Sequence, residues 1–294
     1  MNEITVTKAT SVSIGSVDLF FYNDDVQKRL DAYQRIENPV SASITGASRS
    51  GRKVLAAVAN YSDSLYSWSD INSFESASGI SSDIDDDDPL LPVMSGVTHI
   101  NAGKDYTVNL SLTPLMSEIV VRSLRCDFSQ RSYHDDVLSD IKVYLVNVCT
   151  RSNLFGGPEG LSPDYINLGR LDSLKLKSMK KPQLFCAKIE GKVGSSAIKP
   201  DTKLYCYPNC SKEETMGTPF TRLVIEGRLN GRLYYYPVNV NGNRPVERGT
   251  RYVMDILLTR TGCDDPDSAL ESGAAVVSVD VEKWKEKEKQ HVRF

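Results

Sequence analysis

Side chains able to bind a metal ion gather at one place in this sequence, a run of aspartates at residues 83–88. Five of those six residues are aspartate. An oxygen-rich loop of this kind holds Ca²⁺ when a glycine at its sixth position allows a sharp turn and a glutamate at its twelfth position closes the site. Counted from Asp83, those positions hold Asp88 and Met94. We therefore interpret the run as a solvated acidic loop rather than a calcium site.

The histidines do not indicate a catalytic or metal centre either. His99, His134 and His291 lie far apart, and none has another ligand at metal-binding spacing. His134 is followed by Asp135 and Asp136 in a polar stretch, which makes the one cluster of histidine with acids in the sequence. No nucleophile elbow, P-loop, Rossmann glycine pattern or zinc-protease helix is present. We therefore expect neither an enzyme nor a bound cofactor.

The cysteines have no metal-binding pattern. Six are present, and only Cys206 and Cys210 lie close together, with three residues between them. Zinc would need a second close pair or a nearby histidine. We interpret the cysteines as buried or half-buried thiols on separate strands. The alternative, a disulfide between Cys206 and Cys210 in an oxidising compartment, would close only a short loop and so add little stability.

Length and composition are those of a globular protein with two domains. A chain of 294 residues suits two domains of roughly 100–200 residues each. The net charge of −3 argues against a nucleic-acid partner, which usually needs a basic face. No apolar run approaches the ~18 residues that predict a transmembrane helix. The first residues lack the basic start and apolar stretch of a signal peptide, so the protein is cytosolic or its export signal was trimmed or missed.

The elements that must position any functional side chain are β-strands. Apolar residues alternate with polar ones most strictly between Tyr106 and Leu112, and again between Tyr252 and Leu258, as half-buried strands require. Val277, Val279 and Val281 repeat the pattern near the end of the chain. Helical periodicity is scarce. Strands at a spacing of about 8–12 residues with turn signals between them favour β-sandwiches.

These patterns predict an all-β protein with two tandem β-sandwich domains. The glycine- and proline-rich residues 149–160 are read as the boundary between them. The first domain then spans residues 1–150 and contains a Ser- and Asp-rich surface loop with a short helix at 61–88. The second spans residues 151–294 and ends in a polar tail, 285–294, which cannot form a core.

In the order and spacing of many short segments, the chain resembles the fimbrillins of Bacteroidales bacteria, the subunits and accessory proteins of type V pili. Each segment alone is weak, but together they are fairly specific. In the first half they are residues 17–22, 91–96, 106–110, 119–121, 126–128 and 141–147. In the second half they are residues 205–209, 221–227, 235–238, 251–252, 259–262, 265–267 and 277–284.

The resemblance implies transthyretin-like sandwich domains, secretion as a lipoprotein and assembly into surface fimbriae that mediate adhesion and biofilm formation. Its implied location is the extracellular fimbrium at the outer-membrane surface. The implied partners are other fimbrial subunits, in a homo- or hetero-polymer, and host or bacterial surface receptors. In polymerising members an Arg-specific protease removes an N-terminal strand, and a terminal strand of another subunit fills the opened groove by donor-strand exchange.

The chain departs from that pattern in two places. No lipobox cysteine occurs, since the first cysteine is Cys126, and no arginine precedes Arg29. These two departures bear on how the protein would assemble rather than on the resemblance to the family. If strand exchange applies, two segments are candidates for insertion into a neighbour. They contain Val277, Val279, Val281 and Trp284 in the first, and Val292 and Phe294 in the second.

Two alternatives remain open from the sequence. The interpretation of residues 275–284 as the last strand of their own second domain is slightly favoured, which leaves the tail as the better donor. The protein can also be a secreted, monomeric glycan-binding module that uses the loop aromatics Tyr61, Tyr66 and Trp68. Those aromatics are equally consistent with a loop that packs onto the sandwich.

Overall fold

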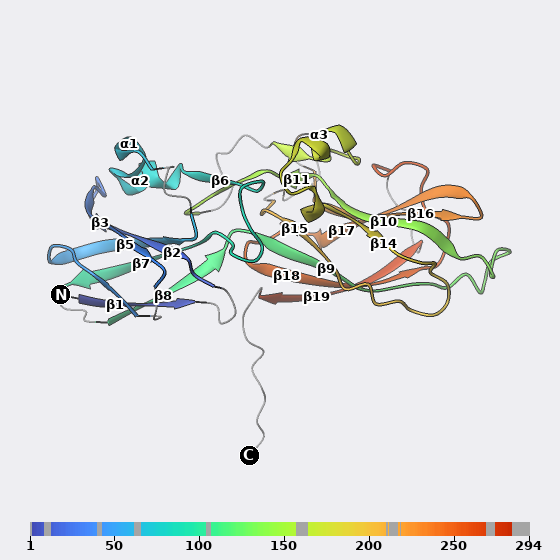
Figure 1. Cartoon of the computed structure of the whole chain (residues 1–294), viewed down its shortest axis with the longest axis horizontal. Coiled ribbons are helices and arrows are strands. Elements are labelled where there is room, and N and C mark those ends of the chain that lie inside the picture. The colour runs from blue at the N-terminus through green and yellow to red at the C-terminus, as the bar shows by residue number, and fades with distance from the viewer. Residues whose placement is uncertain are drawn as a thin grey trace, which may run out of the picture. The chain divides into compact units, whose positions relative to one another are not determined.

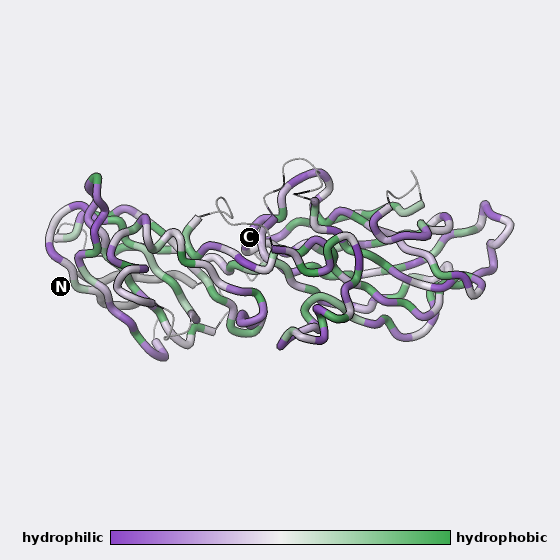
Figure 2. The backbone as a smooth tube through the Cα atoms, turned by 90° about the horizontal axis from the view of Figure 1, so that it is seen from above, coloured by the Kyte–Doolittle hydropathy of each residue, from purple (hydrophilic) through white to green (hydrophobic). Residues whose placement is uncertain are grey.

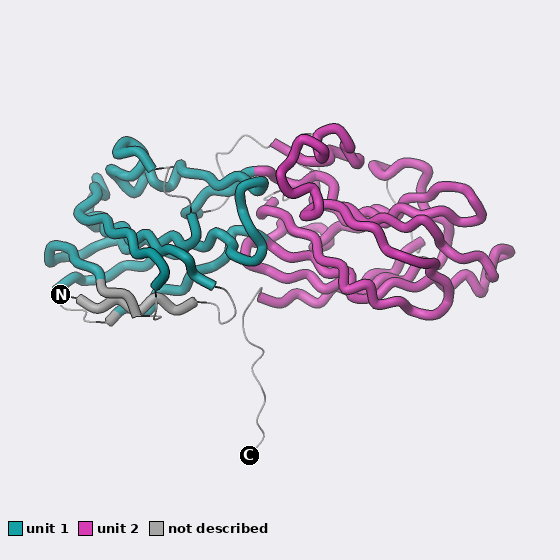
Figure 3. Tube along the Cα trace, viewed as in Figure 1, with its two compact units in different colours: residues 1–116, 151–161, 284–294 teal, residues 117–150, 162–283 magenta. Residues whose placement is uncertain are grey.

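The computed structural model describes residues 2–8, 13–39, 43–61, 66–103, 107–156, 164–209, 211, 217, 219–268 and 274–283. The chain divides into two compact units (Figure 3). Unit 1 comprises residues 1–116, 151–161 and 284–294, and unit 2 comprises residues 117–150 and 162–283. Almost all described elements are β-strands, so the predicted all-β class is confirmed. Apolar stretches (green) recur in the interior of each unit, and many of the outer turns are polar (purple) in Figure 2.

Unit 1 contains a seven-stranded sheet in the order β3-β2-β5-β7-β8-β1-β4 (Figure 1). β7 pairs with β5 over its whole length but with β8 only at Met94 and Ser95, so the sheet folds over there into two layers. The elements of this unit are β1 (Asn2–Lys8), β2 (Ser16–Asn23), β3 (Leu30–Glu37), β4 (Ser43–Gly46), β5 (Gly51–Ala59), α1 (Trp68–Ile71), α2 (Phe74–Ser78), β6 (Ser81–Asp83), β7 (Met94–Ala102), β8 (Thr107–Pro114) and β12 (Arg151–Asn153).

The core of unit 1 lies between those two layers. It joins Leu19 of β2 and Leu55 of β5 to Leu110 and Leu112 of β8, all of them buried. The opposite face of β2 and β5 is also covered, and β5 is buried on both faces, as its uninterrupted apolar run predicts.

Aromatic side chains cover that second face. Phe20 of β2 contacts the rings of Tyr33, Tyr66 and Phe155 at centroid distances of 5.1, 5.4 and 6.2 Å. The predicted surface loop 61–88 therefore includes α1, α2 and β6, and part of it covers the sheet instead of extending into solvent (Figure 1). Asp18 is the buried charge on this face, 2.8 Å from Arg35 and 2.7 Å from the Tyr33 hydroxyl.

Unit 2 contains two four-stranded sheets, β14-β10-β16-β17 and β15-β9-β18-β19. Figure 1 shows them as two layers, and both contribute fully buried side chains, such as Leu145 and Ile225 in the first and Met254 in the second. The elements are β9 (Ser117–Cys126), β10 (Leu138–Val146), β11 (Val148–Cys149), β13 (Tyr165–Ile166), α3 (Ser173–Ser178), η2 (Pro182–Leu184), β14 (Cys186–Ile189), β15 (Thr202–Cys206), β16 (Arg222–Leu229), β17 (Arg232–Asn243), β18 (Thr250–Leu258) and β19 (Ala275–Lys283).

The division between the units differs from the predicted boundary at residue 150. It falls between Met116 and Ser117, and residues 151–161 return to unit 1. Backbone pairing explains the difference, because β9 and β10 pair with strands of unit 2 whereas β12 pairs with β6 of unit 1. Turn-forming residues mark where a chain reverses, but they do not say which sheet the next strand joins. Within the described residues, no helix has the length and apolar character needed to span a membrane.

Candidate functional site

The candidate inserting valines lie on β19, at the edge of a four-stranded sheet of unit 2. β19 runs antiparallel to β18, with Val277 opposite Ile256, Val279 opposite Met254 and Val281 opposite Tyr252. Val277 and Val279 are half-buried, whereas Val281 is 59% exposed. β19 therefore pairs within unit 2, as the alternative of a last strand of its own domain expects. Trp284, Val292 and Phe294, the other candidates, lie outside the described residues.

Charged side chains hold β19 in place from two strands away. Arg122 of β9 donates to Asp255 of β18 and, through Nη2 at 2.7 Å, to Asp280 of β19. Hydrogen bonds from Arg122 and then Ser123 lower the pKa of Asp255 below its usual value, against a smaller effect of burial. Because one guanidinium bridges both carboxylates, the edge strand is tied to the interior of its sheet. Sequence reasoning did not identify this bridge, since its residues are far apart in the chain.

β1 is the second element of interest, because it lies between two strands of unit 1 (Figure 1). It is parallel to β8, with Ile4 opposite Val108 and Val6 opposite Leu110, and antiparallel to β4. Without β1 both neighbours would have an unpaired edge, next to the core that contains Leu110. The strand was not predicted. The signal that could have indicated it is a short alternation of Ile4 and Val6 with polar residues.

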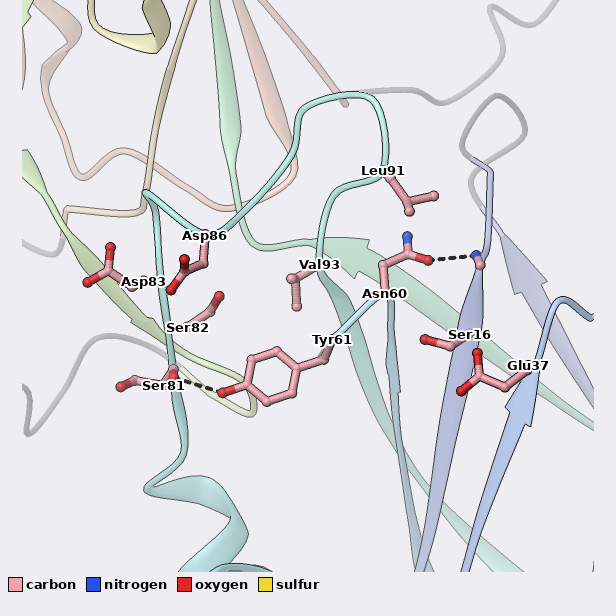
Figure 4. A pocket seen from close by; sticks show the side chains of 11 residues that line it. Ser16, Glu37, Asn60, Tyr61, Ser81, Ser82, Asp83, Asp86, Leu91 and Val93 are labelled. Atoms are coloured by element: carbon pink, nitrogen blue, oxygen red, sulfur yellow. Dashed lines mark hydrogen bonds between the residues drawn. The ribbon is translucent and has the colours of Figure 1, made fainter. Parts of the chain in front are cut away.

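A pocket of about 460 Å³ opens at one end of the unit 1 sheet (Figure 4). Glu37 lies on one side of Asn60 and Tyr61, and Asp83 and Asp86 lie on the other. The Asn60 amide accepts the Gly15 N–H at 2.8 Å and donates to the Pro92 carbonyl at 2.9 Å. The Tyr61 hydroxyl donates to the Ser81 carbonyl at 3.1 Å. The polar groups of Asn60 and Tyr61 therefore hydrogen-bond to the backbone of other segments of unit 1, which gives them a structural role.

The aspartate run has a structural role that was not predicted. Asp87 is buried, and its Oδ1 accepts the N–H groups of Asp88 and Val93 at 2.8 and 2.9 Å. The expectation of a wholly solvated loop is therefore wrong at Asp87, although Asp83 and Asp86 are exposed. Within the part of the chain that the structure describes, no group of three or more potential metal ligands comes together.

The histidines stay separate in the structure. His99 is exposed, 3.4 Å from Asp24, and His134 is exposed, 3.0 Å from its neighbour Asp135. His291 lies outside the described residues. The described cysteines are free thiols, and Cys206 is fully buried in a setting that raises the pKa of its thiol. Cys210, its predicted alternative partner, is outside the described residues.

The aromatic residues of the alternative glycan site do not form one surface. The Tyr61 side chain is buried, and its ring lies 5.4 Å from that of Tyr66. Tyr66 in turn packs edge-on against Phe20. Only Trp68 of the three is well exposed, at 68%. A single exposed ring does not form the stacking platform that the alternative required.

Comparison with known proteins finds similar structures but no similar sequence family. The chain matches neither a protein-family model nor a curated protein sequence. Its structure is similar to that of a fimbrilin from Porphyromonas gingivalis, with a TM-score of 0.70, 14% identity and coverage of 98% of each chain. A candidate cell adhesion protein from Bacteroides eggerthii gives a TM-score of 0.70 at 15% identity, covering 96% of this chain and 95% of that one.

A third similar structure is the C-terminally truncated tip fimbrial protein Mfa3 of Porphyromonas gingivalis. Its TM-score is 0.57 at 12% identity, over 96% of this chain and 99% of that one. At such low identities the likeness concerns the fold. The chain has the fimbrillin fold along nearly its whole length, as the resemblance implied.

Proposed function

We propose that this protein is a structural and adhesive subunit of a bacterial surface fimbria, in contact with other fimbrial subunits on the cell exterior. The observation that carries the proposal is the match of both units together to a fimbrilin, over 98% of each chain. A fold alone permits several functions. Two features support assembly through strands in this proposal: the position of β1 between β8 and β4, and the apolar residues Val292 and Phe294 in the sequence after β19.

The replaceable strand in this proposal is β1. Its backbone completes the pairing of β8 and β4, and its removal after Lys8 would expose two strand edges and the apolar side of β8. Unpaired edges and exposed core are unstable in water, so the opened unit would bind another strand strongly. Backbone hydrogen bonds would supply affinity, and alternate apolar side chains would supply register.

The donor in this proposal is the tail at residues 285–294, with β19 remaining in place. All nine residues of β19 pair with β18, and Arg122 holds Asp280, so withdrawal of β19 would break unit 2. Val292 and Phe294 are two residues apart in the sequence, as are Ile4 and Val6 of β1, which pair in backbone register with Val108 and Leu110. The tail therefore has apolar residues at the spacing that the vacated position requires.

The experiment places a specific protease site at residues 9–12 of the full chain and of a chain that lacks residues 285–294. After cleavage we expect the full chain to form ladders of oligomers that resist SDS. The shortened chain should keep the same melting temperature and stay monomeric. A Val292→Asp/Phe294→Asp variant should behave like the deletion, whereas a Lys287→Ala/Lys289→Ala variant, which changes only polar tail residues, should polymerise.

Two results would contradict parts of this proposal. Normal ladders from the shortened chain would show that the tail is not the donor. If the cleaved full chain forms no oligomers at any concentration, while both units remain folded, strand insertion is not how the protein assembles.

A further inference from the structure

Two opposite charges and an amide meet inside the sandwich of unit 1. The ammonium of Lys53 is 2.6 Å from Oδ1 of Asn23 and 3.0 Å from Oδ2 of Asp31. The side chains of Lys53 and Asp31 are only 3% and 4% exposed. Burial of charged groups is costly, and an apolar pair of the same volume is often as stable or more stable. Stability alone therefore does not explain why Lys53 and Asp31 are buried in this core.

The strand pairing places Lys53 and Asn23 side by side. They are direct partners in the antiparallel pair of β2 and β5. Phe21 and Leu55, the next pair on the same face, belong to the hydrophobic core. Asn23 and Lys53 therefore continue the core face of their strands, since residues two apart share a face.

Asp31 reaches the same position through an irregularity of β3. In the pairing of β2 with β3, Phe21 faces Ala32 but the next residue, Tyr22, faces Leu30, so Asp31 is the extra residue of a β-bulge. A bulge redirects the side chain of the residue it inserts, and bulges are frequent beside functional sites. Here the bulged carboxylate contacts the lysine of a strand two positions away in the sheet.

These three groups are the reactants and the proton carrier of an amide-forming reaction. Amines attack carbonyl carbons when a base removes their proton and the two are held in contact. We propose that Nζ of Lys53 and Cγ of Asn23 become joined in a covalent amide bond, formed by the folded protein itself with Asp31 as the proton carrier. The cross-link would be a modification of unit 1.

The atoms balance without an oxidant or a further reactant. Asp31 accepts a proton from the Lys53 ammonium, and the amine lone pair then forms the bond from Nζ to Cγ of Asn23 as the carbonyl electrons move to Oδ1. When the carbonyl reforms, the bond from Cγ to Nδ2 breaks and the electron pair leaves with nitrogen. The departing group takes the protons released by Nζ and by Asp31 and leaves as ammonium, so Asp31 returns to its carboxylate form.

The surroundings determine the resting state of the three groups. Arg49 also faces Asp31, through its backbone N–H at 2.9 Å and its Nε at 3.8 Å. Burial alone would raise the pKa of Asp31, but hydrogen bonds from Lys53 and Arg49 together lower it. Asp31 therefore rests as its carboxylate, and the protonated Asp31 that the reaction passes through is a minor form. Formation of the bond is accordingly expected after folding and slower than folding.

The bond would serve a subunit that carries tension. β2 and β5 lie in the middle of the layer that supports the unit 1 core. A covalent link between them would close the chain from residue 23 to residue 53 and restrict the unfolded state, as a disulfide does, but without sensitivity to reductants.

The test is the mass of the intact, folded full chain. We expect a mass lower than that of the sequence by one ammonia. After trypsin digestion of the unfolded protein, residues 9–28 and 53–104 should appear as one branched peptide, because an acylated Lys53 is not cleaved. An unchanged intact mass after prolonged incubation would overturn the proposal. So would an ammonia loss found in a linear peptide, since asparagine can also lose ammonia by cyclising on its own backbone.

Variants separate the covalent bond from the ion pair. Lys53→Arg keeps a cation beside Asp31 but has no nucleophilic amine, and it should have the full sequence mass. Asp31→Asn removes the proton carrier and should also abolish the mass loss. Lys142→Arg, which changes a lysine paired with Glu226 in unit 2, should keep the branched peptide. A branched peptide in the Lys53→Arg chain, or its absence from the Lys142→Arg chain, would contradict the assignment.

Discussion

Val279 of β19 lies directly opposite Met254 of β18, and Met254 is fully buried. An aspartate at position 279 would place a carboxylate against that apolar surface. We expect Val279→Asp to lower the free energy of unfolding of unit 2 by about 2 kcal/mol, measured by denaturant titration. Val276→Asp makes the same change on the exposed face of the strand, where the loss should stay below about 0.5 kcal/mol. Equal effects of the two variants would refute the burial of Val279.

The buried Asp18 forms an ion pair with Arg35. Their side chains are 2.8 Å apart, and Asp18 is fully buried. We expect Arg35→Met to lower the free energy of unfolding of unit 1 by about 3–5 kcal/mol, because it removes the cation that pairs with a fully buried carboxylate. Arg52→Met breaks a pair in which the arginine is 77% exposed, and should cost less than about 1 kcal/mol. Addition of Asp18→Asn to Arg35→Met should recover part of the loss, and no recovery would mean that Arg35 acts mainly through packing.

The ion pair between Arg122 and Asp255 makes the stability of unit 2 depend on pH in the acidic range. The pKa of Asp255 is lowered in the folded protein, so its contribution is complete above the unfolded value of about 3.9 and is lost as pH falls through the folded value. Because both side chains are partly exposed, we expect Arg122→Gln to lower the stability of unit 2 only slightly at neutral pH and low salt. Chemical denaturation from pH 7 to pH 2 should show the wild-type and variant curves converging at the acid end. A constant difference between the curves would contradict the assignment.

Gly96 allows β7 and β8 to approach each other. A Cβ at that position would lie 2.2 Å from the backbone oxygen of Ser111. We expect Gly96→Ala to lower the free energy of unfolding of unit 1 by about 2–4 kcal/mol, because the backbone must move to admit the methyl group. The melting temperature should fall accordingly. Gly15→Ala is the matched change in the same unit, since its nearest neighbour is 3.6 Å away, and it should be tolerated. A melting temperature of Gly96→Ala equal to that of wild type would show that the two strands can separate freely.

The loop aromatics should differ in what they do for the fold. Tyr66 packs against Phe20, so Tyr66→Ala should cost about 3 kcal/mol, whereas Trp68→Ala should change stability by less than about 0.5 kcal/mol. Calorimetry on both variants checks the contrast. A glycan array probed with wild-type protein and with Trp68→Ala would examine the alternative function. Binding by the monomer that disappears in Trp68→Ala would favour a glycan-binding module.

Local periodicity was enough to identify most of the strands. The alternation from Tyr252 to Leu258 predicted a buried face, and all four apolar residues on it are buried. The uninterrupted apolar run at residues 54–59 is typical of a strand covered on both sides, and β5 is such a strand. Such patterns are readable because a half-buried strand needs only its own residues to show which face is apolar.

Pairing between distant segments was decided by the tertiary structure. The chain by itself determined an all-β protein and the resemblance to fimbrillins. It did not determine that β12 returns to unit 1, that β1 lies between β8 and β4, or that a bulge brings Asp31 to Lys53 and Asn23. Each of these depends on which strands become neighbours. That choice minimises the exposed edges and apolar surface of a whole unit, and no local segment of the sequence contains it.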